Sequence, residues 1–460
     1  MSSPHATIRP TADSPQLVEQ HARDLDAHDP LRHFREQFCI PTVGDVTRDR
    51  SLTPDKAAEP CVYLCGNSLG LRPRALREAM LEELDDWGRL GVEGHFHARR
   101  PWYPYHEFCR DAAERLVGAR AGAQEVVMMN SLTVNLHLMM VSFYRPTPER
   151  FRIVIEDTAF PSDSYAVQSQ AAFHGLDPAA AIVRLKPRAG EQTLRTDDVE
   201  SFLLSPEGRS VALVLLGGVN YLTGQLMDMQ RITAAGHRAG CVVGWDLAHA
   251  AGNAPLQLHD WNADFACWCT YKYLNSGAGA VAGCFVHERH GKMTGRFGES
   301  NFLPRFAGWW GNDPATRFKM GPDFFPREGV EAWQLSNPPI MALAPVRLSL
   351  EIFDKAGMSA LRAKSERLTA YLQGLIDAIP GVTQVVEVIT PRDPAARGCQ
   401  LSLAVKDRPR ALHEALSRDG VVSDFREPNV IRIAPTPLYN TFHDCWRFAK
   451  ILRRHVAGEA

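Results

Sequence analysis

The segment 241-CVVGWDLAHA-250 decides the fold of this 460-residue chain. Its apolar run Cys241–Trp245 is typical of a buried strand, and Asp246 follows where that strand ends. A second apolar run, Phe265–Cys269, is followed closely by Lys272. Because ligands of an open α/β sheet bind at the carboxyl ends of its strands, we expect the Asp246 carboxylate and the Lys272 amine to meet at one edge of a sheet.

The chain around this segment alternates strand-like and helix-like stretches. Arg152–Ile155 and Val211–Leu216 are further short β-branched runs, and helical stretches separate them. This alternation predicts an α/β fold with a mostly parallel central sheet flanked by helices. We expect this large domain to span residues 61–340, after an N-terminal helical arm over residues 1–60.

A smaller α+β domain is predicted over residues 341–460, after the break at Asn337-Pro338-Pro339. The apolar spacing predicts helices over Met341–Ala356, Ser359–Ile379, Arg410–Asp419 and Phe442–His455. Strands are expected over Thr383–Ile389, Gln400–Val405 and Val430–Ile433.

The composition is that of an ordinary globular protein. Basic residues number 51 and acidic residues 53, so no overall field attracts nucleic acid or an anionic membrane. Met1–Gln16 is polar, and no apolar run approaches the roughly 18 residues of a membrane span. The ten cysteines are scattered, without the spacing of a metal site. We therefore expect a cytoplasmic protein with buried thiols, no metal, and neither nucleic-acid nor membrane partners.

An acid and a lysine presented together suit pyridoxal 5'-phosphate (PLP) as the cofactor. The Lys272 amine can form a Schiff base with the cofactor aldehyde, while the Asp246 carboxylate keeps the pyridine nitrogen protonated. The protonated ring then accepts electrons from bonds at the substrate α-carbon. On their own, the two residues could equally be a strand-end cap and a solvated surface lysine.

Two turns could complete such a site. Asn130-Ser131-Leu132-Thr133 opens an apolar helical stretch whose first amides could bind phosphate, although its polar residues could simply cap the helix. Phe160-Pro161-Ser162-Asp163 could place an aromatic ring beside the cofactor. The competing glycine-rich segment 277-GAGAVAG-283 is one residue too long for a dinucleotide loop and opens no first βαβ unit, which disfavours a nicotinamide or flavin enzyme.

Together with further motifs, these strings resemble the kynureninases, in order, over about Tyr63 to Trp446. The further motifs are 65-CGNSLG-70, 100-RPW-102, 271-YKYLN-275, 336-SNPP-339 and 432-RIAP-435. The resemblance implies the PLP-dependent transferase-type fold (fold type I) and a homodimer with active sites at the subunit interface. It also implies hydrolytic Cβ–Cγ cleavage of L-kynurenine or 3-hydroxy-L-kynurenine to L-alanine and an anthranilate. This reaction belongs to tryptophan catabolism (the kynurenine pathway) and to NAD biosynthesis.

The resemblance also assigns roles to individual residues. Lys272 and Tyr271 are implied to be catalytic, Asp246 to hold the pyridinium, and Arg432 to clamp the substrate α-carboxylate. Further cofactor contacts are implied for Leu132, Thr133, Phe160, Asp163, His249, Tyr271, Trp309 and Asn337. Substrate contacts are implied for His95, Ser336 and Asn337. The residue types at these three positions are similar to those of kynureninases that favour 3-hydroxykynurenine. Gly217-Gly218 departs from relatives with a hydroxyl residue there, which puts a cofactor contact from this position in doubt.

Two alternatives share this fold. A cysteine desulfurase or selenocysteine lyase requires a reactive cysteine on a mobile loop, and no cysteine stands out in such a loop. A catalytically inactive PLP-fold binding protein is disfavoured because Lys272, Asp246, Tyr271 and Arg432 are all present. Singly, His249, Phe160 and Trp309 could also be packing residues, and Arg432 part of an ion pair.

Overall fold

The computed structural model describes residues 18–292, 297, 299 and 302–457. The segment Met1–Gln16, whose polar character contributed to the expectation of a cytoplasmic protein, lies outside these residues. The chain divides into two compact units. Unit 2 comprises Ala75–Tyr221 and Gln225–Met358, and unit 1 the described parts of Met1–Arg74, Leu222–Gly224 and Ser359–Ala460. The three-part division at residues 60/61 and 340/341 stays a prediction.

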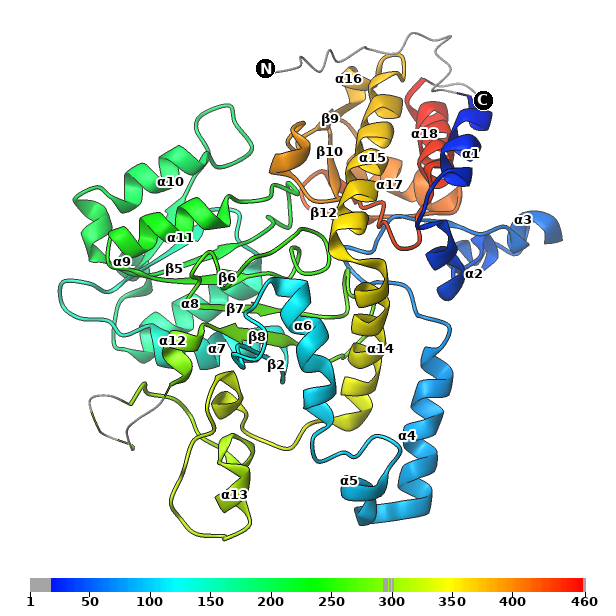
Figure 1. Cartoon of the computed structure of the whole chain (residues 1–460). Coiled ribbons are helices and arrows are strands. Elements are labelled where there is room, and N and C mark those ends of the chain that lie inside the picture. The colour runs from blue at the N-terminus through cyan, green and yellow to red at the C-terminus, as the bar shows by residue number, and fades with distance from the viewer. Residues whose placement is uncertain (1–17, 293–296, 298, 300–301, 458–460) are drawn as a thin grey trace, which may run out of the picture. The chain divides into compact units, whose positions relative to one another are not determined.

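Unit 2 is built on a seven-stranded sheet of order β2-β8-β7-β6-β5-β3-β4 (Figure 1). Its strands are β2 (Val126–Met128), β3 (Arg152–Glu156), β4 (Ile182–Leu185), β5 (Val211–Gly217), β6 (Val242–Asp246), β7 (Phe265–Trp268) and β8 (Gly283–Val286). All neighbouring pairs are parallel except those that β8 makes with β7 and β2. The predicted α/β fold with a mostly parallel sheet is confirmed, and the predicted strands β3, β5, β6 and β7 are correct to within one residue.

Helices flank this sheet (Figure 1). The helices of unit 2 are α4 (Leu76–Leu90), α5 (Gly94–His97), α6 (Arg110–Val117), α7 (Leu132–Phe143), α8 (Pro161–Phe173), α9 (Pro178–Ala181), α10 (Thr196–Leu203), α11 (Met229–Arg238), α12 (Glu288–Gly291), α13 (Pro314–Arg317) and α14 (Ile340–Ala356). α14 packs against α4 and α6. Among the described helices of the whole chain, none combines the length and the apolar character that a bilayer span requires.

Tight packing around β6 fixes the position of its last residue, Asp246. The Trp245 side chain is fully buried and its Nε1 donates a hydrogen bond to Thr233 Oγ1 at 3.1 Å. A Cβ atom on Gly244 would lie 2.1 Å from the Phe265 ring, so only glycine permits this approach of β6 to β7. The strand that presents Asp246 therefore has little freedom to shift.

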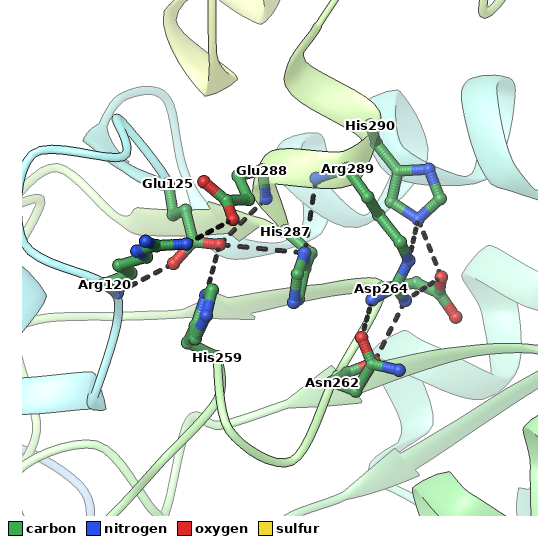
Figure 2. A network of polar contacts seen from close by, with 9 residues as sticks. All are labelled: Arg120, Glu125, His259, Asn262, Asp264, His287, Glu288, Arg289 and His290. Carbon is green, nitrogen blue, oxygen red and sulfur yellow. Dashed lines mark hydrogen bonds and ion pairs between the residues drawn. The ribbon is translucent and has the colours of Figure 1, made fainter.

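A buried carboxylate joins the amino-terminal ends of β6 and β7 (Figure 2). Asp264 accepts hydrogen bonds from the Val243 amide at 2.7 Å, from His290 Nε2 at 2.7 Å and from His237 Nε2 at 2.9 Å, and it pairs with Arg289. Burial alone would raise the pKa of Asp264, but the two histidines and Arg289 hold it well below its usual value. The carboxylate is thus ionised and holds both strands from the end opposite Asp246.

A second anchor in the same network is Glu125, just before β2 (Figure 2). Its carboxylate accepts hydrogen bonds from the amides of Arg120 and Glu288, both at 2.8 Å, and lies 2.9 Å from His259 Nδ1. The His259 and His287 rings stack with centroids 4.8 Å apart and planes 17° apart. A cation held by both rings would have to lie in both ring planes, which stacked rings do not allow. Glu125 is best explained as a hydrogen-bond anchor for the start of α12.

Unit 1 contains a four-stranded antiparallel sheet of order β12-β13-β10-β9 and a parallel pair, β1 and β11. Its strands are β1 (Val62–Tyr63), β9 (Val386–Val388), β10 (Leu401–Val405), β11 (Val421–Val422), β12 (Asp424–Arg426) and β13 (Val430–Ile433). Its helices are α1 (Glu19–Ala27), α2 (Val43–Thr47), α3 (Pro54–Ala58), α15 (Met358–Asp377), α16 (Val382–Val385), α17 (Pro409–Arg418) and α18 (Phe442–Ala457). Leucine, isoleucine and valine side chains from the sheet, α15 and α18 form its core.

The α+β character predicted for the carboxyl-terminal region is confirmed, with one correction. The predicted strand Thr383–Ile389 is wrong over its first half, because Val382–Val385 form the short helix α16 and only Val386–Val388 pair as β9. Gly381, with φ at 75°, begins this turn in a conformation that β-branched residues avoid. The β-branched composition alone does not reveal the turn.

Asp264→Ala is expected to destabilise unit 2 by roughly 2–4 kcal/mol, because the Val243 amide loses its acceptor and Arg289 loses its counter-charge. Denaturant titration of the full chain measures the effect. The matched control is Asp198→Ala, which removes an exposed pair with Arg188 and should cost below about 1 kcal/mol. Equal losses in both variants would show that the network is not a strand anchor.

Candidate active site

A cavity of about 170 Å³ lies in unit 2 at the carboxyl ends of its strands. Its lining includes the predicted site residues Leu132, Thr133, Phe160, Asp163, Asp246, His249, Tyr271 and Lys272, and further Ser131, Glu156, Ser162, Gly217, Val219, Tyr221 and Ala248. The fold thus brings together residues that are far apart in the sequence, from the start of α7 to the segment after β7. The expectation that the Asp246 carboxylate and the Lys272 amine share one sheet edge agrees with this arrangement.

Lys272 lies where its amine can act on a ligand. Its Nζ is 3.2 Å from His249 Nε2 and about equally far from two ring centroids, 5.8 Å from Phe160 and 5.7 Å from Tyr271. Burial raises the pKa of the Tyr271 phenol far above its usual value, and the neighbouring Cys269 thiol adds to the effect. At neutral pH, Tyr271 is therefore a proton donor beside the lysine amine.

Asp246 and Asp163 form a carboxyl pair in the same cavity. Asp246 Oδ1 accepts a hydrogen bond from the Ala248 amide at 2.7 Å, which fixes this side chain at the end of β6. Burial raises the pKa of Asp163 well above its usual value, and the charge of Asp246 and a hydrogen bond to it raise it further. The protonated form of Asp163 is therefore favoured beside Asp246.

The amino-terminal ends of two helices face the same cavity. Ser131 precedes α7 without a side-chain capping bond, and α8 begins at Pro161 after Phe160. Thr133 Oγ1 and Ser162 Oγ are 2.9 Å apart and join the two helix starts. Exposed amides at a helix start, with the positive end of the helix dipole, favour an anionic group such as a phosphate.

Three lining residues were not anticipated from the sequence, namely Glu156, Val219 and Tyr221. Glu156 is the last residue of β3 and is buried, and Tyr221 lies edge-on to Phe160 with ring centroids 5.3 Å apart. The signal for Glu156 was available, because it follows the strand run Arg152–Ile155 as Asp246 follows Cys241–Trp245. Tyr221 follows β5 only after an irregular turn, which sequence periodicity does not locate.

Four predicted residues of unit 2 do not line the cavity. Ser336 and Asn337 are exposed, and Trp309 is 41% exposed, with its Nε1 donating to the Arg317 carbonyl at 3.4 Å. His95 packs edge-on against Trp102, with ring centroids 5.7 Å apart. Arg432 belongs to unit 1, where it is buried and pairs with Asp424 at 2.6 Å. Their assigned roles stay predictions.

The residues of the cavity fit PLP. A carboxylate, an amine and two helix starts match the three reactive features of the cofactor, which are its pyridine nitrogen, aldehyde and phosphate. The Phe160 side chain is 38% exposed although it lines the cavity, so its ring is available to a planar ligand. Lys272, Asp246, Phe160 and the starts of α7 and α8 would hold the group.

Solved structures with the same fold are PLP enzymes. The cysteine desulfurase of Thermococcus onnurineus is 17% identical, with a TM-score of 0.70 over 91% of this chain and 99% of that one. A variant of C-DES with glycine covalently linked to its PLP cofactor is 18% identical, with a TM-score of 0.69 over 88% of this chain and 99% of that one. At these identities the likeness shows the fold, and it confirms the predicted fold type.

The sequence comparisons are more specific. Residues 62–321 match the aminotransferase class-V family, and residues 361–452 match the kynureninase C-terminal domain. The kynureninase of Salinispora tropica is 61% identical over 441 residues, and that of Myxococcus xanthus 55% over 438, each spanning 95% of this chain and 97% of the relative. With Lys272 and Asp246 facing one cavity in the PLP fold, these matches show that the chain belongs to the kynureninase family of PLP-dependent hydrolases.

Proposed function

We propose that the chain hydrolyses the Cβ–Cγ bond of L-kynurenine and 3-hydroxy-L-kynurenine, with 3-hydroxykynurenine preferred. The products are L-alanine and anthranilate or 3-hydroxyanthranilate. The observation that carries the proposal is the 55–61% identity to kynureninases over nearly the whole chain, combined with the lysine, aspartate and tyrosine that share one cavity. The desulfurase alternative has less support, because Cys267, Cys269 and Cys284 of this sheet are all buried.

The roles of the residues follow from their positions. Bound PLP supplies an electron sink for bonds at the substrate α-carbon. Asp246 would hold the pyridine nitrogen protonated, and Lys272 would anchor the aldehyde. The Lys272 amine would also carry the substrate α-proton, and His249, 3.2 Å away, orients this amine. Tyr271, kept protonated by burial, donates a proton on the same side.

We further propose a homodimer whose subunits complete each other's sites. An exposed aromatic surface on unit 2 supports it, in which Phe96 stacks on Tyr103, Tyr103 on Phe318, and Phe318 lies edge-on to Trp309. Phe96 and Phe318 are 57% and 58% exposed. Contiguous exposed rings of this kind are typical of a protein interface.

Two of the predicted residues that do not line the cavity, His95 and Trp309, belong to this surface or contact it. His95 is in ring contact with Phe96 at one end, and Trp309 lies at the other. A second copy could receive both side chains at its own cavity, together with the exposed Asn337.

We also propose a cytoplasmic location, since none of the ten cysteines, all within the described residues, forms a disulfide.

Lys272→Ala is expected to abolish turnover of both kynurenines and the visible absorbance of the bound cofactor, because the amine is both anchor and proton carrier. Borohydride reduction of the wild type followed by peptide mass spectrometry should place the cofactor on Lys272. Lys186→Ala is the matched control, since Lys186 is exposed and should leave both properties unchanged. A label on a different lysine would overturn the assignment.

Mixing Lys272→Ala with His95→Ala subunits is expected to restore activity that neither variant has alone. If His95 acts across the interface, each mixed dimer contains one intact site, and random assembly gives about a quarter of wild-type activity. Activity after refolding or co-expression measures this. If His95 serves its own subunit, no mixed dimer contains an intact site and no activity returns.

Asn337→Thr is expected to reduce the preference for 3-hydroxykynurenine, because the Asn337 amide can hydrogen-bond the ring hydroxyl. Unsubstituted kynurenine lacks this hydroxyl and leaves the polar pocket group unpaired, which costs about 1–3 kcal/mol of interaction free energy. That cost corresponds to roughly tenfold to a hundredfold in kcat/KM. The ratio of kcat/KM for the two substrates is the measurement. A wild-type preference for unsubstituted kynurenine refutes the proposal, and an unchanged ratio in the variant assigns the preference to other residues.

A further inference from the structure

The site contains a buried acid, Glu156, to which the resemblance to kynureninases assigns no role. Glu156 ends β3, is only 4% exposed and lines the same cavity as Lys272 and Asp246. Its two carboxyl oxygens lie 3.2 and 3.3 Å from the Gly217 amide, which donates to them. A buried acid with this position must either carry a proton or be paired with a cation.

The surroundings of Glu156 favour the protonated form. The charged groups that line the cavity with it are the Asp163 and Asp246 carboxyls and the Lys272 amine. Burial raises the pKa of Glu156 to about 7, the negative charge of Asp246 adds to this, and hydrogen bonds from Gly217 and Asn220 oppose it. The positive charge of Lys272 lowers the pKa of Asp163.

A neutral carboxyl group has one O–H donor in addition to its acceptor oxygens. The hydrogen bonds that the described residues make to the Glu156 carboxyl come from N–H donors, namely Gly217 and Asn220. The acid proton is therefore directed to an acceptor in the cavity. Gly217 leaves the space for this, because a Cβ there would lie 2.9 Å from Glu156 Oε1.

The acceptors of PLP are few. Its phosphate suits the helix starts at Ser131 and Phe160, and its pyridine nitrogen suits Asp246. The remaining acceptor is the ring oxygen next to the aldehyde carbon that Lys272 attacks. We propose that Glu156 donates a hydrogen bond to this ring oxygen, and so supplies the polar contact that Gly217, which has no side chain, cannot make.

This proposal rests on the proposed PLP site and gives Glu156 a positioning role. A donor to the ring oxygen makes that oxygen less basic, so it weakens proton retention by the adjoining imine nitrogen. Removal of the donor should therefore raise the pH midpoint at which the visible absorbance of the bound cofactor changes. The expected rise is about one pH unit for one ordinary hydrogen bond.

The test compares Glu156→Leu, Glu156→Gln and Gly217→Ala as holoenzymes by absorbance titration. Glu156→Leu should raise the midpoint by about one unit, and Gly217→Ala should raise it too, because its Cβ displaces the carboxyl without adding a donor. Glu156→Gln, whose amide still donates, should shift it by less than half as much. An unchanged or lowered midpoint in Glu156→Leu overturns the proposal, and so does an equal rise in Glu156→Gln, because the glutamine amide retains the donor.

The stability of the full chain gives an independent readout. Because the pKa of Glu156 is raised in the folded protein from 4.5 to about 7, its stabilising contribution is complete below pH 4.5 and is lost as the pH rises to 7. Glu156→Gln should remove this loss, and a loss identical to wild type would show that Glu156 does not hold the proton. If Glu156→Leu shows the expected absorbance shift but the wild type turns over neither kynurenine, the proposed substrate fails and the Glu156 contact stands.

Discussion

The burial of three carboxyl groups around one amine is the constraint on which this site depends. Glu156, Asp163 and Asp246 line the cavity with Lys272. Each of the three acids is less than a tenth exposed, whereas the lysine is partly exposed. Three ionised carboxylates at this depth would cost several kcal/mol each. Burial and the charge of Asp246 raise the pKa values of Glu156 and Asp163, so protonation of these two acids lowers the cost.

This arrangement requires a rigid sheet, because protons are shared only over short distances. Glu156, Gly217 and Asp246 end three adjacent strands, and a one-residue slip would turn each side chain to the other face. The contact of Gly244 with Phe265 and the anchor at Asp264 prevent such a slip from the middle and the far end of β6. Packing along the sheet thereby helps to fix the positions of the acids at its carboxyl end.

The sequence predicts the part of this site that depends on local pattern. Strand runs followed by Asp246 and Lys272 predict the sheet edge, and ordered motifs supply most of the other lining residues. The position of Glu156 at a strand end has a local signal, but its contact with Gly217 depends on the pairing of β3 with β5. Pairing between strands so far apart in the chain has no local signal. The helical turn α16 was missed for a similar reason, since Gly381 overrides the β-branched residues after it.

The residues proposed for catalysis are buried, whereas those proposed for substrate choice are exposed in the single chain. This difference affects how substrate specificity can change. Asp246 and Glu156 are buried among groups whose protonation they set, so a substitution there alters the charge of the whole cluster. Asn337 and Ser336 are exposed in the single chain, and substitutions at such positions usually change stability by less than about half a kcal/mol. If these residues reach a neighbouring subunit's cavity, as proposed, the preference between the two kynurenines can vary without disturbing the proton balance that the reaction requires.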